Sequence, residues 1–99
     1  MDLQQFKDSL SKDQPQDSWN FLLKALWYDA KGDWHKAHDL ADGPPGEEAA
    51  WVHAYLHRKE GDDWNANYWY RSAGRTMSTL TLEAEWEELV LYFLQLSTS

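Results

Sequence analysis

The chain has 99 residues, which fits one domain built around a single hydrophobic core. Its 17 acidic and 9 basic residues give a net charge of −8, and a surface of that sign repels phosphate backbones, which argues against nucleic-acid binding. Cysteine is absent, which excludes disulfides, thiolate metal sites and cysteine nucleophiles and fits a cytoplasmic location.

The apolar pattern predicts an all-α fold. Valine occurs twice and isoleucine never, and no segment alternates with a period of two. A first short helix is expected over residues 3–10, where Asp2 and Gln5 have the spacing of a capping box. Asp17 is expected to cap a second helix, whose apolar residues recur at offsets of three and four: Trp19, Leu22, Leu23, Leu26, Trp27 and Ala30.

Glycine and proline residues mark the expected helix ends in the middle of the chain. Gly32 is expected to end the second helix, and Asp33 to cap a third helix over 34–42. The run Gly43-Pro44-Pro45-Gly46 cannot continue a helix and predicts a tight connection.

Three further helices are expected in the second half of the chain. They cover about 47–60, 64–73 and 82–97, with Gly61 and either Asp62 or Asp63 at the first boundary. A polar connector over 75–81 precedes the last of them. The whole chain is therefore predicted to be one helical domain of five to six helices.

The centre of the chain contains an internal repeat. A pattern in the first half recurs 29 residues later, and it pairs Ala25, Tyr28, Gly32, Asp33, Ala37 and Ala41 with Ala54, His57, Gly61, Asp62, Ala66 and Tyr70. Small residues allow two antiparallel helices to approach closely, and the Gly-Asp pair suits the turn between them. The repeat predicts two helical hairpins, over about 17–42 and 47–73, and a closing helix over about 82–97.

The small-residue, turn and aromatic positions of these hairpins resemble the tetratricopeptide family, which implies a right-handed stack of antiparallel hairpins. The repeat length of 29 residues differs from the usual 34, and the closing proline is missing. The segments WVHAYLHRKEGD and NANYWYRSAGR are also similar to a family of small, uncharacterised bacterial proteins, a resemblance that implies a shared fold and no particular activity.

Four histidines fall in two helical pairs. His53 and His57 are four residues apart and His35 and His38 are three apart, so each pair shares a helix face. Two imidazoles on one helix face form a recurrent metal-binding arrangement, and the sequence allows a divalent metal site at His38, His53 and His57. The alternative is that these histidines are hydrogen-bonded core residues.

A second group combines aromatic residues, asparagine and arginine on the same two helices. Amphipathic rings beside guanidinium groups suit recognition of a peptide or a protein surface. The alternative is that the rings belong to the core, with their polar atoms bonded internally. The candidate binding residues are Trp51, Tyr55, Arg58, Trp64, Asn67, Tyr68, Arg71 and Arg75.

No pattern in the chain predicts a conventional enzyme. The chain has no Gly-x-Ser-x-Gly segment and no phosphate-binding loop. Its longest apolar-rich stretch, residues 89–94, is far shorter than a membrane span, so no membrane contact is expected. The leading hypothesis is a small helical module that binds a protein or peptide, or a second copy of itself. The alternative is a metal- or small-molecule-binding protein that uses His53 and His57 with His38, and no cofactor other than a divalent metal is expected.

Overall fold

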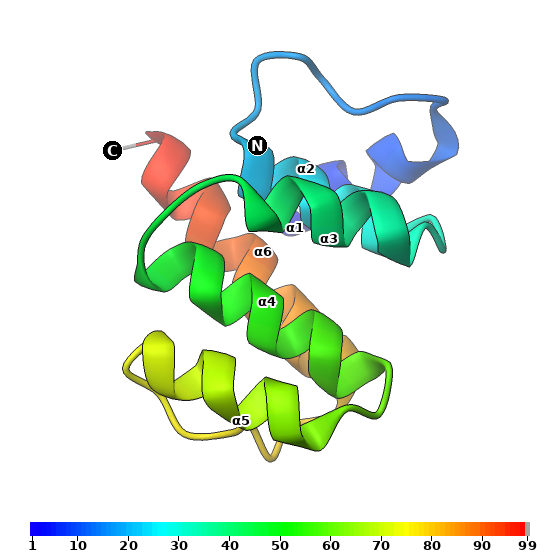
Figure 1. Cartoon of the computed structure of the whole chain (residues 1–99). Coiled ribbons are helices and arrows are strands. Elements are labelled where there is room, and N and C mark those ends of the chain that lie inside the picture. Colours follow the sequence, from blue (N-terminus) through cyan, green and yellow to red (C-terminus); the bar gives the residue numbers. More distant parts are fainter. Residues whose placement is uncertain (99) are drawn as a thin grey trace.

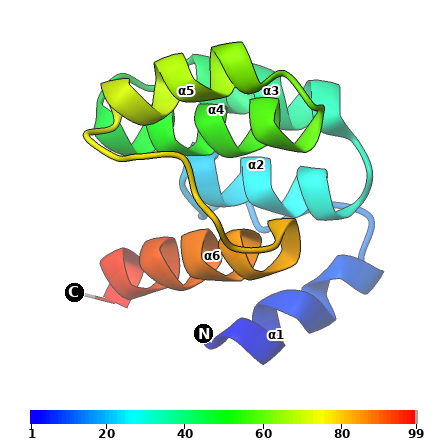
Figure 2. The same cartoon turned by 90° about the horizontal axis from the view of Figure 1, so that it is seen from below.

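A computed structural model describes residues 1–98, and this part of the chain is all-helical (Figures 1 and 2). The prediction of an all-α fold is confirmed. In chain order the helices are α1 (Leu3–Asp8), a short 3-10 turn (Ser9–Ser11), α2 (Phe21–Ala30), α3 (Trp34–Asp42), α4 (Glu47–Lys59), α5 (Asp63–Ser72) and α6 (Leu82–Thr98).

Local side-chain hydrogen bonds determine where α1 and α2 begin. The Asp2 side chain accepts a hydrogen bond from the Gln5 backbone, and the Gln5 side chain accepts one from the Asp2 backbone, which confirms the capping box of α1. The predicted cap at Asp17 is wrong. Asn20 caps α2 instead, accepting from the Leu23 backbone, because Asn20 is the residue with an extended backbone directly before the helix.

Both Gly-Asp turns form as the repeat predicts. Gly32 and Gly61 have positive φ angles of 87° and 85°, a region that glycine enters without strain. Asp33 then caps α3, and Asp62 caps α5, each by accepting a hydrogen bond from the third residue of its helix. As a result α2 packs along α3, and α4 packs along α5.

The four central helices and α6 form a layered arrangement. In Figure 2, α3 and α5 lie on the outer side of α2 and α4, while α6 and α1 cover the opposite side. The tight Gly43–Gly46 connection places α3 beside α4, and the contacts between these two helices join the two hairpins. The metal-site candidates lie at this junction.

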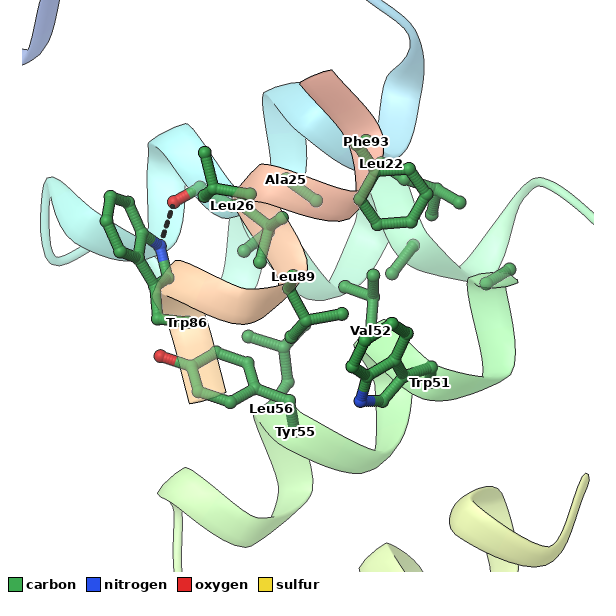
Figure 3. Close-up of a cluster of buried hydrophobic side chains, with 14 of the residues drawn as sticks. Leu22, Ala25, Leu26, Trp51, Val52, Tyr55, Leu56, Trp86, Leu89 and Phe93 are labelled. Atoms are coloured by element: carbon green, nitrogen blue, oxygen red, sulfur yellow. Dashed lines mark hydrogen bonds between the residues drawn. The ribbon is translucent and has the colours of Figure 1, made fainter. Parts of the chain in front are cut away.

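The core fills the space between α2, α4 and α6 (Figure 3). Its centre consists of Leu26, Val52, Leu56, Leu89 and Val90, each with no measurable exposure. Burial of such aliphatic side chains is the main favourable contribution to folding. Among residues 1–98, no helix combines the length and the apolar character that crossing a membrane requires.

Candidate metal centre

Three histidines from two helices meet where α3 packs against α4. His53 and His57 are one turn apart on α4, and His38 comes from α3. One ring nitrogen from each lies within 4.8 Å of the other two. Because His38 is on a different helix from the pair, only the packing of α3 on α4 completes the cluster.

The spacing of the rings suits a shared metal ion. The ring centroids of His38 are 4.6 Å from His53 and 5.3 Å from His57, and those of His53 and His57 are 5.7 Å apart. Nitrogen ligands 2.0–2.1 Å from a tetrahedral zinc ion are about 3.3 Å from one another. Closing the cluster around an ion therefore needs shifts of about 1 Å or less in each ring, within the reach of small side-chain rotations.

His53 is the least satisfied polar side chain of the site. His53 is 3% exposed, and both of its ring nitrogens are buried without a hydrogen-bond partner in the part of the chain the structure describes. Asp42 Oδ1 lies 3.3 Å from His53 Nε2 but without the geometry of a hydrogen bond. A buried polar atom without a partner costs about 1–3 kcal/mol, and such atoms in native proteins usually indicate a bound water or ion or a functional role.

The electrostatic environment keeps the His53 ring neutral. Burial lowers the pKa of His53 from 6.5 to about 4, and the neighbouring His38 and His57 add to this lowering, while Asp42 opposes it. Neutral imidazole is the form that binds metal ions. His53 is therefore ready to act as a ligand over the whole neutral and mildly acidic range.

His57 has the carboxylate partner that metal-binding histidines commonly show. Its Nδ1 lies 2.8 Å from Glu60 Oε1, one helical turn further along the chain. A carboxylate that accepts from one ring nitrogen fixes the tautomer and leaves the other nitrogen free to bind a metal. In His57 that free atom is Nε2.

Two tryptophan rings enclose the histidine cluster. Trp34 stacks on His38 with a centroid distance of 4.9 Å, and Trp69 stacks on His53 at 4.2 Å. The Trp34 indole is itself held in place, because its Nε1 donates to the Leu56 carbonyl at 2.9 Å. These walls limit the orientations of the imidazoles and restrict access by water.

The remaining titratable groups near the cluster have other roles. His35 is exposed and makes an edge contact with Trp34, so it does not belong to the cluster. His57, Glu60 and Asp62 form a second close group, but Asp62 is already engaged in capping α5 through the Asn65 backbone and side chain. The three-histidine cluster is the one with an unpartnered buried ligand atom.

The predicted peptide-binding residues do not form one surface. Trp51 and Tyr55 are buried in the core, 3% and 2% exposed. Arg58 is held internally as well, because its guanidinium pairs with the fully buried Glu85 at 2.8 Å and donates to the Leu80 carbonyl. These three residues are therefore components of the packed interior.

Buried carboxylates explain why these residues turn inward. Glu85 accepts hydrogen bonds from Tyr70 at 2.6 Å and Trp51 at 3.3 Å besides its ion pair with Arg58. Burial and Glu85 together raise the pKa of Tyr70, so its hydroxyl stays protonated as a donor. The sequence shows Glu85 only as one of several glutamates, and no spacing marks it as internal.

The other five predicted binding residues are exposed. Trp64, Asn67, Tyr68 and Arg71 are exposed on α5. Arg75 is also exposed but stacks over the Trp51 ring at 3.5 Å, so it covers the edge of the core. The predicted surface is thus reduced to one stripe along α5.

Comparison of the chain with protein-family models, with curated proteins and with solved structures finds no significant match.

Proposed function

We propose that this protein binds one divalent transition-metal ion through His38, His53 and His57. The observation that carries the proposal is the pair of buried, unpartnered ring nitrogens of His53 inside a three-histidine cluster. A histidine held only for packing normally bonds at least one ring nitrogen, and a metal ion at the cluster would give one of the two His53 nitrogens a partner.

The donor set selects the class of metal. Imidazole nitrogen suits zinc, copper, nickel and ferrous iron, whereas calcium and magnesium prefer oxygen ligands. Three histidine ligands leave a fourth position for water or a carboxylate, and Asp42 brings a carboxylate to the edge of the cluster. We favour zinc, because it accepts a tetrahedral set of nitrogen and oxygen ligands.

Metal binding also has a structural consequence in this fold. His38 belongs to the hairpin of α2 and α3, and His53 and His57 belong to the hairpin of α4 and α5. An ion held by all three joins the two hairpins at their contact. An ion that binds only the folded chain raises its free energy of unfolding by about 2.7 kcal/mol at a free concentration one hundred times the dissociation constant, and any binding to unfolded histidines reduces this.

The test measures metal stoichiometry on untagged protein after dialysis against zinc and then against metal-free buffer. We expect one ion per chain, and its loss in His53→Ala and His57→Ala. His35→Ala is the matched control, since this histidine is exposed and outside the cluster, and it should retain the ion. Substitution with cobalt should give the visible absorption of a tetrahedral complex. Zinc should raise the unfolding temperature of the wild type and of His35→Ala, and should not raise that of His53→Ala or His57→Ala.

Two outcomes would refute the metal site. Protein that holds no zinc or cobalt at micromolar free concentrations would show that the cluster is only part of the core. Equal metal loss in His35→Ala and His53→Ala would show that the ion binds elsewhere. Far-ultraviolet circular dichroism of each variant establishes whether the helices remain folded.

A protein-binding role is the second candidate, and a specific observation favours it. Trp64 is 78% exposed and Tyr68 is 56% exposed, one turn apart on the same helix. Large aromatic side chains that remain in water on one stripe commonly belong to an interaction surface. This role does not depend on the metal site.

A further inference from the structure

The outer face of α5 lies at an edge of the molecule. Helix α5 packs on α4, and among the described residues no other helix makes a comparable contact with it. Figures 1 and 2 show it at the outside of the helix layers, beyond α4. In a stack of hairpins this is the face against which a further helix would pack.

An ordered stripe of exposed side chains runs along this face. It starts with Asp63 and Trp64 at the beginning of α5, continues with Asn67 and Tyr68, and ends with Arg71 in the last turn. Within residues 1–98, Arg71 has no ion pair and no side-chain hydrogen bond. The stripe therefore carries an acidic end, an aromatic centre and a free cationic end.

This order of side chains is complementary to itself. When two copies of α5 lie antiparallel around a two-fold axis between Asn67 and Tyr68, Trp64 of one copy faces Arg71 of the other, and Asn67 faces Tyr68. The Arg71 guanidinium then covers the face of the Trp64 ring and lies beside Asp63 of the other copy, and both contacts are favourable. A two-fold axis makes each contact occur twice.

We propose that the α5 stripe binds a second copy of this chain, with the two α5 helices antiparallel. The charges at the two ends of the stripe favour this partner over an unrelated peptide, because each copy supplies both the Asp63–Trp64 end and the Arg71 end that pairs with it. Two crossing helices cover less area than the 1,200–2,000 Å² of a standard interface, so the dimer is weak. The net charge of −8 on each copy opposes association further, and salt screens that repulsion.

The test is sedimentation equilibrium of the full chain from about 10 µM to about 1 mM in about 0.15 M salt, a range that covers micromolar to millimolar dissociation constants. A chelator is present throughout, so that an ion at the histidine cluster cannot bridge two molecules. We expect the weight-average mass to rise toward that of a dimer. Trp64→Ala and Arg71→Glu should each weaken association by about tenfold, as loss of an aromatic or arginine side chain that makes a main interface contact does.

Matched variants make the test specific to α5. Phe21 is also strongly exposed, at 58%, but lies on α2, so Phe21→Ala should leave association unchanged. The double variant Asp63→Arg with Arg71→Glu restores opposite charges across the interface and should recover association lost in Arg71→Glu alone.

Three results would overturn the proposal: a chain that remains monomeric at about 1 mM, association that Phe21→Ala weakens as much as Trp64→Ala, and a charge swap that restores nothing. Because the chelated protein is used, the outcome is independent of the metal proposal.

Discussion

Burial of His53 makes the stability of the metal-free protein sensitive to acid. The folded-state pKa of His53 is about 4, whereas the ring has a pKa of 6.5 in an unfolded chain. Between these two values the unfolded chain binds more protons than the folded one, so the free energy of unfolding falls as the pH falls from 6.5 toward 4. The groups that face this ring are His38, His57 and Asp42.

The size of the effect follows from the two pKa values. Lowering the pH from 7 to 4.5 should remove about 2 kcal/mol from the free energy of unfolding through His53 alone. Carboxylates that titrate over the same range contribute as well. A comparison between the wild type and His53→Phe separates the two, because phenylalanine keeps a ring between His38 and Trp69 and cannot be protonated.

The assay is urea unfolding in chelator at pH 7, 5.5 and 4.5, followed by far-ultraviolet circular dichroism. Relative to the wild type, His53→Phe should gain about 2 kcal/mol in stability on going from pH 7 to pH 4.5. His35→Phe, at an exposed position, serves as the control and should show a smaller change. A difference between the wild type and His53→Phe that is the same at every pH would refute the reasoning, since it would mean that the ring titrates alike in both states.

Two further predictions concern the buried carboxylates. Glu85→Ala leaves the Arg58 guanidinium in the interior without its counterion and should cost about 3–5 kcal/mol in urea unfolding, while Glu85→Gln should cost less because it still accepts hydrogen bonds; equal stability of Glu85→Ala and the wild type would contradict this account. Tyr55→Phe removes the hydrogen bond of 2.8 Å to the buried Asp29 and should cost about 1–2 kcal/mol in thermal unfolding. A change below a few tenths of a kcal/mol there would mean that Lys59, 2.8 Å from Asp29, suffices alone.

Helix starts and turns were predictable where one residue type has a special local role. The capping box at Asp2 and the turn at Gly32 depend on the backbone within four residues, which a short pattern specifies. The start of α2 was missed because Asp17 and Asn20 are both good caps. Only the packing of the preceding segment decides between two such residues.

The candidate sites depended more strongly on the tertiary structure. Periodicity indicates that Trp51, Tyr55 and Arg58 share a helix with His53 and His57, but it does not tell which face turns toward Glu85. Arg58 points inward because a buried carboxylate from α6 meets it, and that partner is 27 residues away in the chain. Long-range ion pairs of this kind leave no local signal.

The sequence by itself determined the all-α class, the two Gly-Asp turns and the pairing of histidines on helix faces, since all of these follow from interactions between near neighbours in the chain. The tertiary structure decided that His38 from α3 meets the His53–His57 pair on α4, and that both His53 nitrogens are buried without a partner. It also decided that Trp64 and Tyr68 stay in water while Trp51 and Tyr55 do not. The physical reason is that burial is set by which helix faces pack together, and that packing depends on all of the helices at once.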